Sequence, residues 1–270
     1  LRTKAIAVLL GPAGIGLLGA FGMLLEFARS VAHLGLNGSG VRQIAEAASS
    51  GDERRLAVTA LVLRRATLLC ALLGAIVLGA ASSAVSRLTF GTDQHGTSIL
   101  LLSVALFLSV LASGQTALLQ GTRRVAELAK VNVYGALLGT IATVTIVYFA
   151  AERGIVPSLV AAAAATIVLS WWYSRKVRTV EVVLNVGETA RESALLLKLG
   201  LAFLASSLFM LGAGYAVRTF VLRTLGLDAA GMYHAAWTAG GLYVGFVLQA
   251  LGTDFYPRLA GVAHDHQACN

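Results

Sequence analysis

Apolar runs of about 20 residues recur along this sequence, and they limit its possible folds more than any other feature. The clearest run, 97–120, holds no charged residue. A helix of about 20 residues is about 30 Å long, which matches the hydrocarbon core of a bilayer. Only 13% of the residues are charged, against about 25% in a soluble domain. The sequence therefore predicts an all-α integral membrane protein, a polytopic helix bundle.

Polar and Gly/Pro-rich turns divide the chain into about eight transmembrane helices. We expect them at 1–10 (the end of a first helix), 15–36, 53–86, 97–120, 131–150, 156–173, 194–224 and 229–252. The turn at 11–14 separates the first two. Residues 36–40 end the second helix, and a short surface helix follows at 41–50. Ser50 is expected to cap the third helix, with Glu53 reaching back.

The longest polar segment, 174–193, predicts a division into three parts. Residues 1–173 form an N-terminal lobe, 174–193 a linker, and 194–270 the start of a second lobe. The chain opens on Leu1 within an apolar stretch and stops without a terminating feature. We therefore expect a fragment of a larger protein.

Lys and Arg are distributed unevenly between the two ends of these helices. One side carries twelve of them: Arg42, Arg54, Arg55, Arg123, Arg124, Lys130, Arg175, Lys176, Arg178, Arg191, Lys198 and Arg258. The other side carries four: Arg87, Arg153, Arg218 and Arg223. Cytoplasmic loops are enriched in Lys and Arg, so the first side is predicted to be cytoplasmic. The net charge of +8 is then explained by orientation charges and does not indicate a nucleic-acid partner.

Three ionisable residues on the second helix are the main functional signal. Glu26, Arg29 and His33 lie at i, i+3 and i+7, so a helix places them on one face. Such groups usually face a bundle interior or a water-filled cavity, because each costs about 2.5–3.5 kcal/mol at the centre of a membrane helix. Arg29 is either an anion-binding residue or a structural partner of Glu26. Glu26 is favoured as that partner over a proton or cation carrier, and His33 either titrates or is hydrogen-bonded at the interface.

Further cations could share a cavity with Arg29. Arg2 and Lys4 precede the first turn, and Arg218 lies late on the seventh helix. Simple anchoring at the interface is the alternative for Arg218. Tyr233 and Trp237 are one turn apart and could contact a sugar ring, although aromatic residues also form interfacial belts.

Motifs for other classes are missing from the sequence. There is no Walker A motif, nucleophile elbow, HExxH or pair of catalytic carboxylates, so we expect no enzyme and no cofactor. His264-Asp265-His266 is a lone short cluster and predicts no metal site. Cys70 and Cys269 do not form a disulfide framework.

Several segments together resemble Wzx-type O-antigen and polysaccharide flippases. They are LRTKAIAVLLGPAGIGLLG, HLGLNGSGVRQIAEAASSGDERRLA, LLQGTRRVAELAKVNVYGALLGT, IVPSLVAAAAATIVLSWWYSRK and GLDAAGMYHAAWTAGGLYVGFVLQALGTDFYPRL. No single motif is diagnostic, but the ordered set covers nearly the whole chain. These flippases belong to the multidrug/oligosaccharidyl-lipid/polysaccharide exporter superfamily.

The resemblance implies twelve to fourteen helices in two pseudo-symmetric lobes, in the bacterial inner membrane. It implies transfer of undecaprenyl-diphosphate-linked oligosaccharide from the cytoplasmic to the periplasmic leaflet by alternating access. Arg2, Arg29 and Arg218 fall on helices that would line a cationic central cavity. Besides membrane lipids, a polysaccharide polymerase and a chain-length regulator would be partners. The alternatives are a multidrug or small-molecule exporter, a membrane-embedded polysaccharide polymerase or ligase, and a structural subunit.

Overall fold

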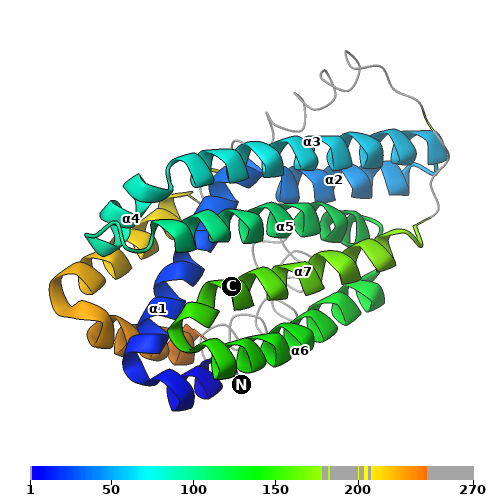
Figure 1. Ribbon diagram of the computed structural model, residues 1–270. Coiled ribbons are helices and arrows are strands. Elements are labelled where there is room, and N and C mark those ends of the chain that lie inside the picture. Colours follow the sequence, from blue (N-terminus) through cyan, green and yellow to red (C-terminus); the bar gives the residue numbers. More distant parts are fainter. Residues whose placement is uncertain (1, 178–181, 183–199, 201–203, 206–207, 242–270) are drawn as a thin grey trace, which may run out of the picture.

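The computed structural model describes residues 2–177, 182, 200, 204–205 and 208–241, with side chains from Lys4 onward. Its described part consists of helices and turns (Figure 1). The elements before residue 175 are α1 Arg2–His33, α2 Leu36–Ser49, α3 Glu53–Ala80, α4 Ser82–Phe90, α5 Gly96–Gly121, α6 Val125–Ala150, the 3₁₀ turn η1 Ala151–Gly154, and α7 Ile155–Ser174. Residues 208–241 are also helical.

A sharp bend at Gly11 joins the first two predicted helices directly. Gly11 has a φ of 68°, a left-handed value that glycine adopts at little cost. Pro12 then begins the next helical segment, where its missing N–H costs no hydrogen bond. The predicted turn is therefore present, but it is a kink within α1 and contains no loop. α1 ends at His33, three residues before the predicted end.

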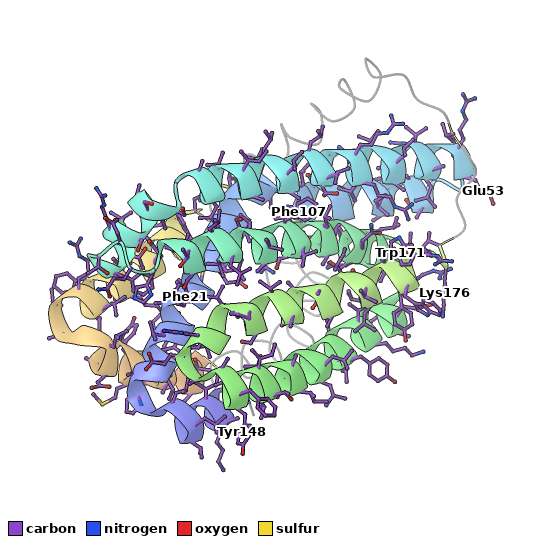
Figure 2. The ribbon with its side chains drawn as sticks, in the orientation of Figure 1. Phe21, Glu53, Phe107, Tyr148, Trp171 and Lys176 are labelled. Atoms are coloured by element: carbon purple, nitrogen blue, oxygen red, sulfur yellow. The ribbon has the colours of Figure 1, made fainter. Side chains whose placement is uncertain are left out.

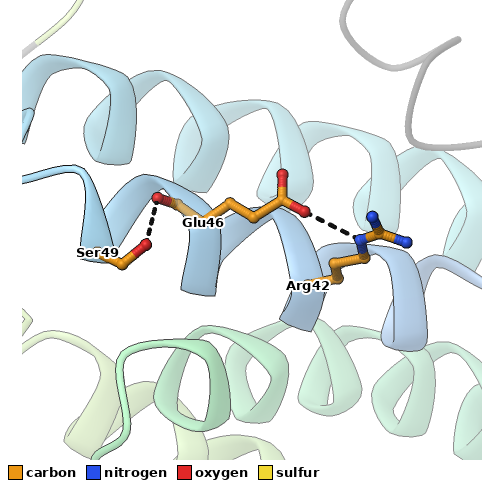
Figure 3. A network of polar contacts seen from close by, with 3 residues as sticks. All are labelled: Arg42, Glu46 and Ser49. Carbon is orange, nitrogen blue, oxygen red and sulfur yellow. Dashed lines mark hydrogen bonds and ion pairs between the residues drawn. The ribbon is translucent and has the colours of Figure 1, made fainter. Parts of the chain in front are cut away.

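α2 differs from the predicted short surface helix in both length and burial. It begins at Leu36, so the segment 36–40, which was expected to end the preceding helix, forms its first turn. Leu36 and Ile44 are fully buried, and α2 packs on α3 and α5. Its other edge is polar: Arg42 Nε donates to Glu46 Oε1 at 2.9 Å, and Ser49 Oγ donates to the Glu46 carbonyl (Figure 3). α2 is thus a half-buried amphipathic helix.

The third predicted helix is divided into α3 and α4, with the break at Ala81. The predicted cap is also corrected. Asp52, not Ser50, caps α3, and its carboxylate accepts a hydrogen bond from the Arg55 amide at 3.0 Å. Ser50 instead donates to the Ala47 carbonyl at the end of α2. Asp52 directly precedes the first residue of α3, so its carboxylate reaches the free amides of the first turn.

α5 is the central helix of the described bundle. It contacts α1, α2, α3, α4, α6 and α7, and Ile99, Leu102, Ala105 and Leu119 on it are fully buried. An uncharged helix can be surrounded in this way because no charge has to be removed from water. The helix also allows close contact, since a Cβ at Gly114 would lie 2.7 Å from Thr67 Oγ1 of α3.

α6 and α7 form an antiparallel pair joined by η1 (Figure 1). The predicted basic loop at 121–130 is mostly helical, because α6 begins at Val125. Gly135 and Gly139, four residues apart, are buried against α7. A Cβ at Gly139 would lie 3.1 Å from the Ala162 Cβ. These two glycines therefore serve helix packing, as small residues do in membrane bundles.

Residues 208–241 contain a left-handed glycine, Gly226, with a φ of 84°. The chain turns back in this part of the structure (Figure 1). Gly226 lies between the two predicted helices 194–224 and 229–252. The predicted linker at 174–193 lies almost wholly outside the described residues, as do the start of the seventh helix and the end of the eighth.

Five helical stretches in the described residues are long and apolar enough to span a membrane. One of them, Val125–Ser174, contains both α6 and α7, and another, Leu208–Gly241, contains the turn at Gly226. The predicted number of eight spans is therefore not established. Outward apolar side chains, such as Leu69 and Val77 of α3 and Ile141 of α6, are more than half exposed. Such faces suit a lipid environment.

The two ends of the bundle carry the charges as the sequence predicts. The start of α3 and the end of α7 lie at one end, where Glu53, Trp171 and Lys176 are labelled (Figure 2). α4 and η1, with Arg87 and Arg153, lie at the other end (Figure 1). Arg175 stacks over Trp171, with its Cζ 4.5 Å from the ring centroid. Arg64 and Arg65 lie away from this end, about 16 Å along α3 from its first residue.

Candidate functional site

A cavity of about 810 Å³ lies between α1 and the helices α5, α6 and α7. The turn after α1, the start of α2, and Leu204, Leu211, Arg218 and His234 complete its wall. Its size falls within the usual range of about 300–1,000 Å³ for ligand sites. Glu26, Arg29, His33 and Arg218, all named from the sequence, line this cavity. The single face that these α1 residues share is therefore directed to one cavity.

Arg29 and Glu26 form an ion pair on the α1 wall. One terminal nitrogen, Nη2 of Arg29, donates to Glu26 Oε2 at 2.6 Å. The two side chains are 42% and 48% exposed, so the pair is open to the cavity. A guanidinium has five N–H donors, and this contact uses one of them. Arg29 can therefore keep Glu26 and still bind an anion from the cavity.

His33 is held by the backbone at the beginning of α2. Its side chain is buried, and Nδ1 accepts a hydrogen bond from the Asn37 amide at 3.0 Å. An accepting Nδ1 means that the ring is neutral and carries its proton on Nε2. Nε2 is buried and has no partner among the described residues. Of the two alternatives given for His33, titration or a hydrogen bond at the interface, this contact is of the second kind.

Arg218 approaches α1 from the later part of the chain. It lines the large cavity and also a much smaller pocket of about 20 Å³, which it shares with Tyr233 and His234. α1 and this region approach closely because glycines face one another. A Cβ at Gly19 would lie 2.7 Å from His234 Cγ, and one at Gly16 would lie 2.3 Å from the Leu227 carbonyl oxygen.

The other predicted site residues are not brought together with Arg29. Lys4 is exposed near the start of α1 and is absent from the cavity lining. Arg2 lies in α1, but its side chain is outside the described part of the structure. Tyr233 lines only the small pocket, and its ring is 6.0 Å from that of Trp237. Trp237 is 58% exposed and lines neither space.

The sequence reasoning missed a group of uncharged polar residues on the same cavity. They are Ser109, Ser113 and Thr116 of α5, Asn132 of α6 and Thr166 of α7. A signal was present for three of them, because positions 109, 113 and 116 recur with the helical period. His234 was also missed, although it lines both the large cavity and the small pocket.

In the described part of the chain, no group of three or more His, Cys, Asp or Glu residues could hold a metal ion.

A mainly apolar pocket of about 340 Å³ lies on the opposite side of α1, between α1, α3 and α4. Phe27 and Tyr215 both border it, and their rings are stacked with centroids 5.2 Å apart. Tyr215 is also hydrogen-bonded to Thr89 of α4 through the two hydroxyl groups. This contact separates the apolar pocket from the small pocket beside Arg218.

The fold is similar to that of a known membrane transporter. A multidrug resistance MATE family transporter of the MOP superfamily, solved in an inward-facing conformation, superposes with a TM-score of 0.72 at 17% identity. The match covers 88% of this chain and 56% of the transporter. The present chain therefore spans little more than half of that protein's length. At this identity the likeness establishes the fold alone, an α-helical bundle of the MOP type.

The sequence comparison identifies the family. Residues 5–270 match the family described as polysaccharide biosynthesis protein, whereas no curated protein matches the chain. The family description names polysaccharide biosynthesis, and the fold is one that a membrane transporter also adopts. This chain belongs to the polysaccharide biosynthesis protein family.

Proposed function

We propose that this chain forms part of a flippase for polyprenyl-diphosphate-linked oligosaccharides in the bacterial inner membrane. The observation that carries the proposal is the cavity of about 810 Å³ with Arg29 and Arg218 on its wall. It occurs in a chain that has a transporter fold and belongs to a polysaccharide biosynthesis family. In this proposal the undecaprenyl chain of the substrate stays in the bilayer while the diphosphate enters the cavity.

The chemistry of arginine suits this substrate. The guanidinium is planar and always charged, and its fork of donors matches phosphate oxygens. A diphosphate in a low-dielectric cavity needs such fixed cations to replace its water. An inside-negative membrane potential also favours outward movement of two negative charges, by roughly 4–5 kcal/mol per 100 mV. Alternating access would then release the diphosphate on the periplasmic side.

Arg29→Ala tests the proposal in the protein expressed from the intact gene. We expect flipping of lipid-linked oligosaccharide in proteoliposomes to fall by about 10- to 100-fold, because a charged hydrogen bond contributes about 1.5–3 kcal/mol. Arg29→Lys should retain part of the activity. Arg42→Ala is the matched control, since Arg42 also pairs with a glutamate but lies outside the cavity lining. Wild-type flipping by Arg29→Ala at equal protein level would overturn the proposal.

A small-molecule exporter is the second candidate, and the similarity to a multidrug resistance transporter favours it. A cationic drug would need a free carboxylate. In the described lining the acidic residue is Glu26, which is paired with Arg29. Drug efflux that responds to Glu26→Gln and not to Arg29→Ala would support this candidate.

Under the flippase proposal, a polysaccharide polymerase and a chain-length regulator would act on the delivered repeat unit.

A further inference from the structure

The large cavity has two chemically different walls. α1 contributes Glu26, Arg29 and His33, which are ionisable. The helices α5, α6 and α7 contribute five uncharged polar side chains, here called the polar wall: Ser109, Ser113, Thr116, Asn132 and Thr166. The other ionisable groups of the described lining are Arg218 and His234, so α5, α6 and α7 contribute only uncharged polar groups. Ser30 of α1 and Asn37 of α2 are uncharged polar groups as well. A ligand that fills the space therefore meets cationic groups on one part and neutral hydrogen-bonding groups on another.

Three hydroxyl groups of the polar wall already use their protons within their own helices. Ser113 donates to the Val110 carbonyl at 2.7 Å, Thr116 to the Ser113 carbonyl at 3.0 Å, and Thr166 to the Ala162 carbonyl at 2.9 Å. A hydroxyl oxygen that donates in this way keeps its acceptor capacity. These groups can accept hydrogen bonds from a ligand that brings its own donors.

Ser109 and Asn132 add groups with both donor and acceptor capacity. Neither side chain has a hydrogen-bond partner among the described residues, and both line the cavity. An amide carries two donor hydrogens and one acceptor oxygen. Such a mixture of free acceptors and donors fits adjacent hydroxyl groups on one molecule. It fits a phosphate poorly, because phosphate oxygens only accept, and it offers a metal cation no carboxylate.

We infer that the polar wall is the binding subsite for the sugar of the transported lipid. This inference rests on the proposed function and deepens it, because it assigns the carbohydrate to α5, α6 and α7 and leaves the diphosphate to α1. Sugars are polyhydroxylated and uncharged in their simplest forms, so their hydroxyl groups can donate to the free acceptors of the wall and accept from Ser109 and Asn132. The wall would then determine which saccharides bind, whereas Arg29 would bind any polyprenyl diphosphate.

Binding to the protein from the intact gene, purified in nanodiscs, separates the two walls. The probes are polyprenyl diphosphate and the same lipid carrying glucose, galactose or N-acetylglucosamine. Wild type should bind at least one sugar-bearing lipid more tightly than the bare lipid, by about 3- to 30-fold, from a few net hydrogen bonds. In the triple variant Ser109→Ala/Ser113→Ala/Asn132→Ala, the ratio of the Kd for bare lipid to the Kd for sugar-bearing lipid should approach one. The Kd for the bare lipid should stay within about twofold.

The control variant is Ser103→Ala/Thr140→Ala, which removes hydroxyls from α5 and α6 outside the cavity lining. It should keep the wild-type ratio. If the triple variant is not monodisperse, Ser109→Ala alone replaces it and should lower the ratio by about twofold or more. This substitution removes no hydrogen bond to a described residue, so it should fold.

The outcomes distinguish this inference from the proposed function. The sugar subsite is overturned if wild type binds none of the three sugar-bearing lipids more tightly than the bare lipid. It is also overturned if the triple variant keeps the wild-type preference for sugar-bearing lipid, or weakens binding of all four lipids equally. If Arg29→Ala leaves binding of the bare lipid unchanged while the triple variant abolishes the ratio, the sugar subsite stands and the diphosphate assignment fails. Binding of none of the four lipids overturns both.

Discussion

Glu26 occupies one donor of the Arg29 guanidinium and offsets its charge on the cavity wall. The pair is about half exposed, so water screens it and its contribution to folding is small, about 0–1 kcal/mol. A partly screened glutamate is easily displaced when an anion arrives. At the scale of single residues, Glu26 is therefore a competitor of the ligand for Arg29.

Replacing Glu26 by Gln tests this competition. The amide is neutral, so Arg29 gains net positive charge toward the cavity. We expect polyprenyl diphosphate to bind about two- to fivefold more tightly, since an exposed pair contributes about 0.2–1 kcal/mol, and we expect transport to persist. Binding in nanodiscs and flipping in proteoliposomes measure the two effects. Loss of transport by Glu26→Gln, with binding of polyprenyl diphosphate retained, would instead identify Glu26 as a coupling residue.

His95, at the loop end of α5, packs against two aromatic rings. Its ring is 4.3 Å from that of Phe90 and 5.8 Å from that of Phe21, between centroids. Burial lowers the pKa of His95 below its usual 6.5, although the Glu152 carboxylate acts in the opposite direction. The folded protein therefore binds this proton less tightly than the unfolded chain does.

A pH-dependent loss of stability follows from this lowered pKa. As the pH falls through about 6.5, the unfolded chain takes up a proton at His95 that the folded protein resists, so the free energy of unfolding decreases. We expect His95→Gln to flatten this decrease between about pH 7.5 and 5.5. Thermal unfolding in detergent across this range measures it. Parallel curves for the variant and the wild type would contradict the assignment.

At the scale of elements, glycines set the distance between α1 and the region after Gly226. A Cβ at Gly231 would lie 2.0 Å from the Pro12 carbonyl oxygen, and one at Gly16 would lie 2.3 Å from that of Leu227. Backbone atoms cannot move aside as a flexible side chain can. This contact adjoins Arg218 and the small pocket, so it also determines where Arg218 meets α1.

Gly16→Ala should therefore destabilise the protein by about 1–3 kcal/mol, the usual range for overpacking. Gly22→Ala is a matched control on the same helix, since a Cβ there meets nothing within 4 Å. Alanine should be neutral or stabilising at Gly22, by up to about 1 kcal/mol, because it favours the helix. Thermal midpoints of the two variants make the comparison. Equal midpoints would show that the α1 contact tolerates a methyl group.

At the scale of the whole molecule, the basic loops lie at one end of the bundle. The start of α3 and the end of α7 share that end, and α4 and η1 lie at the other (Figures 1 and 2). Lys and Arg in short loops are retained on the cytoplasmic side of a membrane. The structure thus groups the basic loops at one end of the bundle, and the enrichment of Lys and Arg in cytoplasmic loops assigns that end to the cytoplasm.

Cysteine labelling in intact cells tests this orientation. Single cysteines replace Arg87, Arg153, Arg54 or Arg175 in a background in which Cys70 and Cys269 are alanine. A membrane-impermeant maleimide should label positions 87 and 153 and leave 54 and 175 unlabelled until the cells are opened. Labelling at 54 and 175 in intact cells would reverse the assigned orientation, and labelling at all four would contradict the predicted spans.

The sequence predicted the order and the approximate bounds of the helices up to α7. α5, for example, was expected at 97–120 and is found at Gly96–Gly121. It missed the break at Ala81 and the helical start of α2 at Leu36. Neither has a strong local signal: no Gly or Pro lies at the break, and Asn37, Gly38 and Gly40 are poor helix formers that packing holds in a helix.

The sequence by itself determined that this chain is a membrane protein, where its α1–α7 helices lie and which face of α1 carries charge. These properties depend on hydropathy and periodicity over neighbouring residues, so they are encoded locally. Only the tertiary structure decided that Arg29 shares a cavity with Arg218 and Ser109 while Lys4 does not. Such a grouping depends on the rotation and spacing of helices far apart in the chain. Packing against α5 and close glycine contacts set that rotation and spacing.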